Sequence, residues 1–423
     1  MVNKRLGDDR GSTNGWVGAT KPAGGRSRLR RLAGACTAVV VAGLGAGVSG
    51  VGAGPATTAP PTSELAATVP VGSEPADSGP ATSAPVDSVT GSTESAPGSD
   101  AGGDSDWTSV VPGGECQCAD GAEFTFFERT ASPTEVVLFL EGGGACFSAE
   151  TCAFTEEAST TYDWNIGADD DPAQMSGIFD LDNPANPFGG SSFVYVPYCT
   201  GDVHLGDTTR EYSPELTVEH NGYVNGTTAL AYLAETYPDV EQVVVVGESA
   251  GAIAAPVYGA LVSDALPDAR VTVFSDGSGG YPDDPNLSAG TDALWGVVRP
   301  EWVADVPAAG FSIPEMVMLA GQHDPEIVMS RFDYAYDAVQ LVFLDLLGLE
   351  IDLLETIDLN EANIEAAGVD QASFTAAGDS HTLVRQDEFY TMELDGVSLT
   401  DWLSSVIAGE TVEDVHCEEC AAP

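Results

Sequence analysis

One stretch of the sequence restricts the fold more than any other. Residues 243–261 read VVVVGESAGAIAAPVYGAL, with a Gly-Glu-Ser-Ala-Gly sequence at positions 247–251. A continuous run of β-branched residues is typical of a strand that is buried on both faces. The small apolar residues that follow have helical spacing. A serine between two glycines therefore stands where a buried strand ends and a helix begins.

Several other segments continue this alternation of buried strands and helices. Apolar runs that indicate strands stand at residues 136–140, 193–196, 271–274 and 316–319, and helical patterns stand at 225–236 and 250–266. This order predicts an α/β fold with a mostly parallel central sheet flanked by helices. A leucine-rich segment at 334–367 is predicted to be a helical insertion or cap. The pattern at 396–409 predicts a final helix closed by Gly409.

The strand-to-helix context of Ser249 predicts a nucleophile elbow. The flanking glycines permit a tight turn, and the turn lifts the serine hydroxyl above the sheet. A helix that starts at Ala250 offers its free N–H groups to a developing oxyanion. The alternative is a tight glycine turn in which the serine is only structural, because G-x-S-x-G sequences also occur by chance.

A nucleophilic serine needs a base, and the base needs an acid to orient it. In α/β-hydrolases the chain order is serine, acid, histidine. His381 stands in FTAAGDSHTLV after a last short strand, and Asp324 follows the preceding predicted strand. We therefore predict Ser249 as the nucleophile, His381 as the base and Asp324 as the orienting acid. The alternatives are Asp379 as the acid and His323 as the base.

The sequence LFLEGGGACF places three glycines directly after an early predicted strand. Glycines there bring backbone N–H groups close to a substrate, as in the oxyanion loops of lipases and esterases. We predict that Gly143, Gly144 and Ala250 supply the N–H groups of an oxyanion hole. The alternative is a flexible turn without a chemical role.

The charge of the chain excludes several classes of partner. Its 66 acidic and 14 basic residues give a net charge of −52, and only six arginines and no lysine follow residue 32. Binding to phosphate groups requires Lys and Arg, so we expect no nucleic acid partner and no stable membrane association. The acidity indicates either plain solubility or adaptation to high salt, where counterions screen the repulsion.

Composition divides the chain into three segments. Residues 1–54 have a basic start and a small-residue apolar run, which predict a secretory signal, with an uncleaved membrane anchor as the alternative. Residues 55–106 are rich in Pro, Ser, Thr and Ala and predict a disordered linker. Residues 107–423 are predicted to be the folded domain.

The seven cysteines of this domain predict disulfides with one cysteine left over. The C-terminal HCEEC has too few ligands for a structural zinc site.

At these residues the sequence resembles the pectin acetylesterase and Notum family of serine carboxylesterases. The resemblance covers residues 116–403 and is carried by CADGAEFTFFER, LFLEGGGACFSAETC, NPANPFGGSSFVYVPYCTGDVHLGD, VVVVGESAGAIAAPVYG, FSDGSGGY and SHTLV. It implies an α/β-hydrolase-like fold, the same triad and oxyanion residues as above, and a disulfide between Cys146 and Cys152. It also implies that Asp202 and His204 lie near the serine. For His204, a hydrogen bond to a neighbouring carboxylate is the alternative.

Two positions depart from this family pattern, and both bear on the substrate. Gly144 and Ala145 stand where relatives carry an aromatic residue, and Glu248 replaces a small residue or Cys before the serine. Glu248 is therefore a third candidate for the substrate pocket. Either the wall beside the serine is open to longer acyl chains, or the loop at 200–207 and the leucine-rich segment close it. We favour the closed wall, because a very acidic secreted enzyme suits a hydrated carbohydrate.

These features together predict a secreted, monomeric serine esterase that hydrolyses acyl esters, most simply acetyl esters on a polysaccharide, through an acyl-enzyme. It is expected to need no cofactor and no metal. One alternative is a lipid or polyester esterase of the same fold. An alternative of another class is a catalytically silent extracellular binding module.

Overall fold

The computed structural model describes residues 106–155, 161–417 and 420. The predicted signal at 1–54 and all but the last residue of the predicted linker at 55–106 lie outside the described residues. Among the described residues no helix is long and apolar enough to cross a membrane.

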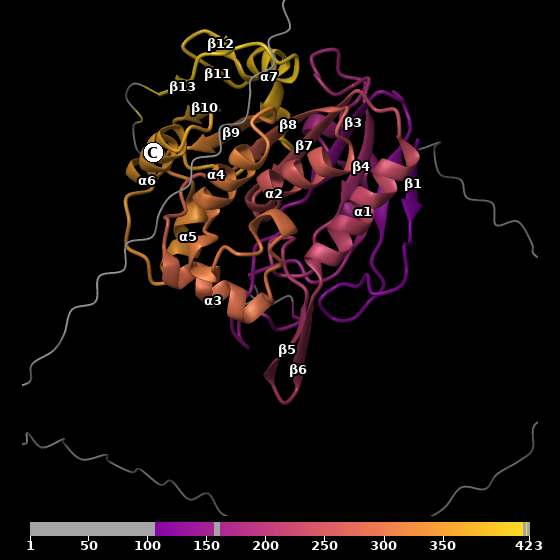
Figure 1. Ribbon diagram of the computed structural model, residues 1–423, viewed down its shortest axis with the longest axis vertical. Coiled ribbons are helices and arrows are strands. Elements are labelled where there is room, and N and C mark those ends of the chain that lie inside the picture. Colours follow the sequence, from indigo (N-terminus) through magenta and orange to yellow (C-terminus); the bar gives the residue numbers. More distant parts are fainter. Residues whose placement is uncertain (1–105, 156–160, 418–419, 421–423) are drawn as a thin grey trace, which may run out of the picture. The chain divides into compact units, whose positions relative to one another are not determined.

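A nine-stranded sheet forms the centre of the domain (Figure 1). Its strand order is β1-β2-β4-β3-β7-β8-β9-β10-β13. Every pair from β4 to β13 is parallel, and β1 and β2 add an antiparallel edge. The strands are β1 (Trp107–Val110), β2 (Phe126–Arg129), β3 (Glu135–Leu140), β4 (Ser192–Val196), β7 (Gln242–Glu248), β8 (Arg270–Asp276), β9 (Val328–Tyr334), β10 (Gln371–Ala376) and β13 (Val415–His416). The mostly parallel sheet confirms the predicted fold class.

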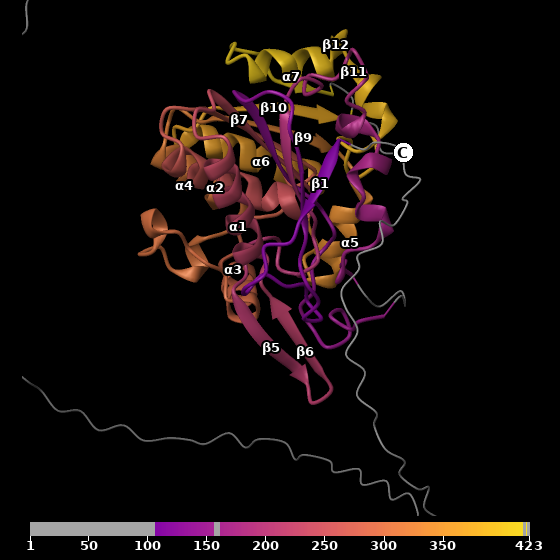
Figure 2. The ribbon, with the colours of Figure 1, turned by 90° about the vertical axis from the view of Figure 1, so that its right-hand side faces the viewer.

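Helices cover both faces of this sheet (Figure 2). Alternate residues along β3 and β7 point to opposite faces, and both faces are apolar, which is why these strands are continuous valine-rich runs. One face packs against α1, α2 and α4, and the other packs against α7. The helices are α1 (Gly222–Thr236), α2 (Ala250–Ala265), α3 (Pro285–Trp295), α4 (Ile313–His323), α5 (Ala338–Leu346), α6 (Leu353–Ala366) and α7 (Leu399–Ile407).

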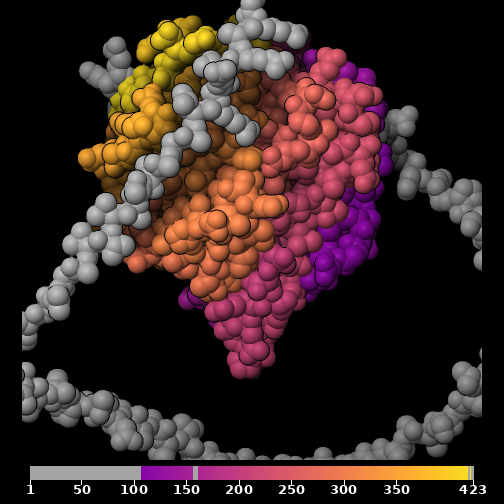
Figure 3. Space-filling model, in the orientation of Figure 1, coloured from indigo at the N-terminus to yellow at the C-terminus, as the bar shows by residue number. Residues whose placement is uncertain are grey.

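Two small hairpins stand outside this sheet. Strands β5 (Thr208–Ser213) and β6 (Leu216–His220) form a two-stranded ribbon that projects from the surface (Figure 3). Strands β11 (Glu393–Leu394) and β12 (Val397–Ser398) form a short antiparallel pair before α7. The predicted final helix corresponds to α7, and Gly409 follows it with a φ of 75°. The leucine-rich segment is helical as predicted, and contains α5 and α6.

The prediction of a strand at residues 316–319 is wrong. These residues belong to α4, whose Met316, Val317 and Ala320 are buried in the core. The strand that follows β8 in the sheet is β9, which the sequence pattern missed because it contains two charged residues. Arg331 and Asp333 are buried within it, and they pair at 2.5 Å. This ion pair lets a charged sequence occupy a central strand.

Three disulfides join the described cysteines: Cys118–Cys199, Cys146–Cys152 and Cys417–Cys420. Cys116 is the free, buried thiol that the odd count required. The pairing of Cys146 with Cys152 confirms what the family resemblance implied. The disulfide between Cys417 and Cys420 uses the thiols of HCEEC, so that sequence offers no thiolate pair for zinc.

Candidate active site

Ser249 lies in a sharp turn between β7 and α2. Its φ of 50° and ψ of −112° are uncommon for a residue with a side chain, and such strain persists only where the surroundings fix it. The N–H of Ser249 donates to the carbonyl of Asp276 at 2.8 Å. A Cβ on Gly251 would lie 2.0 Å from the carbonyl oxygen of Leu140, so only glycine allows α2 to approach β3 this closely. The turn has the geometry expected of a nucleophile elbow.

His381 faces Ser249 from the loop after β10. Its Nε2 lies 2.7 Å from Oγ of Ser249, and its Nδ1 lies 2.7 Å from Oδ2 of Asp337. Because a carboxylate can only accept, Nδ1 carries the proton and donates to Asp337, which leaves Nε2 free to accept from the serine hydroxyl. The structure thus joins a hydroxyl, an imidazole and a carboxylate in one hydrogen-bonded chain.

Asp337 is held rigidly in this position. It is fully buried and forms the N-cap of α5, where its Oδ1 accepts the N–H groups of Val339 and Gln340, each at 2.9 Å. The side-chain amide of Gln340 also donates to Oδ2 at 2.9 Å. These donors stabilise the ionised carboxylate and leave Oδ2 directed at His381. The sequence contained a signal for this role, because Asp337 is an acidic residue directly before a helical pattern.

The expectation that Asp324 orients His381 is wrong. Asp324 stands at the C-terminal end of α4, before β9, whereas Asp337 follows β9. The two carboxylates therefore lie at opposite ends of this strand. The side chain of Asp324 instead accepts hydrogen bonds from the hydroxyl of Ser263 and from the N–H of Glu326. The error came from the false strand at 316–319, which placed Asp324 at the wrong edge of the sheet.

His323 and Asp379, the alternative base and the alternative acid, also lie outside the hydrogen-bonded chain of Ser249, His381 and Asp337. Nε2 of His323 lies 2.8 Å from Asp264, and its ring stacks on Trp302. The backbone carbonyl of Asp379 accepts the N–H of Ala338, at the start of α5. The structure thus brings together Ser249 and His381, two of the three residues predicted for the triad, and replaces the third.

The glycine loop lies directly against the serine. A Cβ on Gly142 would lie 2.8 Å from Cβ of Ser249. Gly144 has a φ of 76°, and a Cβ there would lie 2.0 Å from the carbonyl oxygen of Thr161. The carbonyl of Gly143 accepts the N–H of Asp163 at 2.9 Å, which pins the loop. The loop and the first turn of α2, which begins at Ala250, therefore flank the serine hydroxyl.

Comparisons with known proteins show a sequence similarity to one family over part of the chain. A model of the Pectinacetylesterase family matches residues 109–295. The palmitoleoyl-protein carboxylesterase NOTUM of Schmidtea mediterranea is 28% identical over 153 residues, which is 32% of this chain and 26% of that protein. The palmitoleoyl-protein carboxylesterase notum2 of Xenopus laevis is 28% identical over 99 residues, which is 22% of this chain and 19% of that protein.

A solved structure has a fold similar to that of this chain. The Wnt deacylase Notum from Drosophila superimposes with a TM-score of 0.54 at 16% identity, and the match covers 74% of this chain and 98% of that one. Over these segments the chain is similar to the pectin acetylesterase and Notum family. The matched segments span about a quarter or less of the two curated Notum proteins, and the structural likeness shows the fold alone.

The three candidate pocket residues, Asp202, His204 and Glu248, are buried. His204 is 1% exposed and donates from Nε2 to the carbonyl of Glu141 at 2.8 Å, not to a carboxylate. Burial lowers the pKa of His204 to about 4, so its ring is neutral. Asp202 accepts the N–H of Gly222 at 2.7 Å, and burial raises its pKa to about 6. Glu248 is 5% exposed. All three are buried, and His204 and Asp202 bind backbone groups of neighbouring segments.

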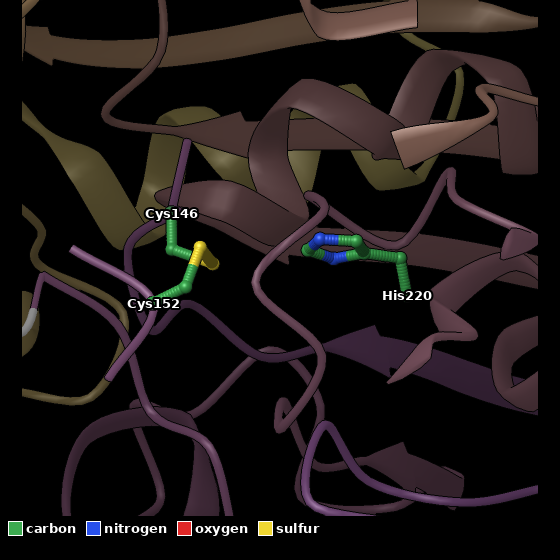
Figure 4. A group of neighbouring side chains, drawn as sticks. All are labelled: Cys146, Cys152 and His220. Atoms are coloured by element: carbon green, nitrogen blue, oxygen red, sulfur yellow. A yellow bond between two sulfur atoms is a disulfide. The ribbon is translucent and has the colours of Figure 1, made fainter. Parts of the chain in front are cut away.

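A disulfide closes the glycine loop at its far end. Cys146, Cys152 and the ring of His220 lie close enough to suggest a metal site (Figure 4). The two sulfurs are bonded to each other, however, and both nitrogens of His220 are in use, one with the carbonyl of Thr200 and one with the hydroxyl of Tyr212. The cluster therefore anchors the loop and offers no metal ligands.

Two depressions open beside the glycine loop. The first is a pocket of about 790 Å³, its open mouth included, with walls that are mostly apolar. Its lining includes Ala145, Phe147, Val203, Leu205, Ile253, Trp295, Phe311, Met316 and Phe343. The second is a shallow groove lined by Gly143, Gly144, Thr161, Tyr162, Asp163, Val339, Val342, Phe343 and Leu346. Phe343 belongs to both, so it forms the wall between them.

Proposed function

We propose that the protein is a carboxylic ester hydrolase with Ser249 as nucleophile, His381 as base and Asp337 as orienting acid. The observation that carries this proposal is the continuous hydrogen-bonded chain from the Ser249 hydroxyl through His381 to the buried Asp337 carboxylate. The kinship with the pectin acetylesterase and Notum family supports the same reaction.

The reaction follows from the positions of these atoms. As Oγ of Ser249 attacks the ester carbonyl, Nε2 of His381 takes its proton, and Asp337 stabilises the imidazolium that forms. The N–H groups of Gly143, Gly144 and Ala250 bind the oxyanion. His381 then gives its proton to the departing alcohol. Water, activated by the same nitrogen, hydrolyses the acyl-enzyme and returns the serine.

The apolar pocket favours an acyl group longer than acetyl. Its wall starts at Ala145, next to the glycine loop, and at Ile253, whose N–H donates to the carbonyl of Ser249. Each CH₂ group buried there would contribute about 0.8 kcal/mol. The relatives named palmitoleoyl-protein carboxylesterases are consistent with such an acyl chain. We therefore place a lipid-like ester ahead of the acetylated polysaccharide that the sequence favoured.

The acetyl ester is the second candidate, and Phe343 is the observation in its favour. This ring packs against Gly144 and so narrows the space beside the serine, which would otherwise be open to a longer acyl chain. Comparison of kcat/KM for acetyl, butyryl and octanoyl esters of one alcohol decides between the two. A rise towards octanoyl supports the apolar pocket as the acyl site, and a steep fall beyond acetyl supports a deacetylase.

A fluorophosphonate probe tests the activity itself. It should label the native protein at Ser249 and should not label a Ser249→Ala variant, which should lose esterase activity on the order of 10⁵-fold while keeping its melting temperature. Failure of the native protein to react would favour the catalytically silent binding module.

We also propose that the protein acts outside the cell. Three disulfides in one domain require an oxidising compartment to form and persist. A secreted or periplasmic fraction that lacks the protein would contradict this proposal.

A further inference from the structure

The three segments that carry the proposed catalytic groups meet at one side chain. Arg385 stands four residues after His381. Its Nε lies 2.6 Å from Oε2 of Glu248, the residue before Ser249. Its terminal nitrogen also donates to Oε1 of Glu141, the residue before the glycine loop. One guanidinium thus links the histidine loop, the elbow and the oxyanion loop.

The remaining carboxylate oxygens are bound by the histidine loop and by the segment after β4. The hydroxyl of Thr382, next to His381, donates to Oε1 of Glu248 at 2.9 Å. The N–H of Tyr198 donates to Oε2 of Glu141 at 3.0 Å. The planar guanidinium suits this arrangement, because its fixed fork of donors can address two carboxylates at once.

Removal of the Arg385 charge should destabilise this part of the protein. Glu141 and Glu248 are 3% and 5% exposed, and Arg385 is one of six basic residues after residue 32. Without the arginine, two buried carboxyl groups would face each other with no cation between them. Burial raises the pKa of Glu141 to about 8, and the charge of Arg385 opposes that rise.

We propose that Arg385 is a positioning residue, which holds His381, Ser249 and the oxyanion loop in register through Glu248 and Glu141. This inference rests on the proposed esterase function. Arg385 contacts neither the serine nor the histidine directly, so it acts through the two carboxylates. It should therefore govern the rate of the chemical step more than the binding of substrate.

The test compares Arg385→Met with Arg270→Met in the complete chain. Arg270 donates to Gln242 and to the carbonyl of Ala408 at the opposite end of the sheet, which makes it a matched control. Arg385→Met should lower kcat by about 10- to 100-fold with KM changed only a few-fold, because small misplacements of reacting groups cost that much. The rate of fluorophosphonate labelling should fall in parallel. Arg270→Met should leave kcat unchanged.

A second variant separates positioning from stability. Arg385→Met with Glu248→Met removes the guanidinium and one of its two glutamate partners, which should restore part of the melting temperature lost in the single variant. We expect kcat to stay low in this double variant. Recovery of kcat together with the melting temperature would overturn the proposal, as would an unchanged kcat in Arg385→Met. If the Ser249→Ala variant kept native activity, that result would instead refute the proposed function.

Discussion

Phe343 on α5 packs against Gly144 in the glycine loop, where a Cβ at position 144 would lie 3.2 Å from Cζ of the ring. An aromatic residue missing from the loop itself is thus supplied by the leucine-rich segment. Four of the seven exposed large hydrophobic residues among those described also lie on α5: Val339, Leu341, Val342 and Leu346. The helix therefore presents an apolar surface beside the proposed oxyanion hole.

Replacement of Phe343 should change the acyl-chain preference. Phe343→Ala removes the wall between the pocket and the groove, so kcat/KM for an octanoyl ester should rise relative to an acetyl ester by about threefold or more. Leu341→Ala, which removes an exposed side chain of the same helix that lines neither depression, is the control. An unchanged ratio in Phe343→Ala would exclude this ring as a determinant of chain length.

A side chain at Gly144 should damage catalysis. The positive φ disfavours any other residue, and the Cβ would collide with the carbonyl of Thr161, so Gly144→Ala must displace the loop. We expect kcat to fall by about tenfold or more. Gly190→Ala, where a Cβ meets nothing within 4 Å, should keep native kinetics. Native kcat in Gly144→Ala would show that the loop does not form the oxyanion hole.

Sequence patterns predicted most of the site because its parts are locally encoded. The four valine- and phenylalanine-rich strands, the glycine turn at Ser249 and the loop of His381 each carry their own signal. Asp337 was missed because its position depends on β9, and the charges of Arg331 and Asp333 hide that strand. A buried ion pair is a tertiary feature, and no periodicity in the sequence reveals it.

The network around Arg385 was beyond sequence reasoning for a similar reason. Glu141, Glu248 and Arg385 are far apart in the chain, and each alone resembles an ordinary surface charge. Only the parallel sheet brings the carboxyl ends of β3 and β7 together with the loop after β10. The sequence therefore suggests Glu248 as a pocket residue, whereas in the structure its carboxylate is bound by Arg385 and Thr382.

Salt should stabilise the protein. The net charge of −52 produces repulsion whose range shrinks from about 10 Å at 0.1 M salt to about 3 Å at 1 M. The melting temperature should therefore rise between 0.1 M and 2 M KCl. A constant or lower melting temperature would count against adaptation to salt.

Stability should also depend on the protonation of Glu141. Burial raises the pKa of this carboxyl group from 4.5 to about 8, against the pull of Arg385 and with a smaller contribution from Asp170. The native state therefore keeps a proton that the unfolded state releases. This contribution to the free energy of unfolding is complete below about pH 4.5 and is lost as the pH rises to about 8.

The variant Glu141→Gln isolates this effect, because glutamine resembles the protonated acid and does not titrate. The native protein should lose stability relative to the variant as the pH rises from 5 to 8, as measured by denaturant unfolding at each pH. A difference that stays constant over this range would show that Glu141 titrates normally.

The most direct test of the proposed Ser249–His381–Asp337 triad compares Asp337→Asn with Asp324→Asn. Asparagine keeps an acceptor for the N-cap of α5, but it cannot hold His381 in the tautomer that serves Ser249. Asp337→Asn should lower kcat by roughly 10⁴-fold with a near-native melting temperature, whereas Asp324→Asn should change kcat by less than about threefold. A full loss of activity in Asp324→Asn with native activity in Asp337→Asn would contradict the proposed triad.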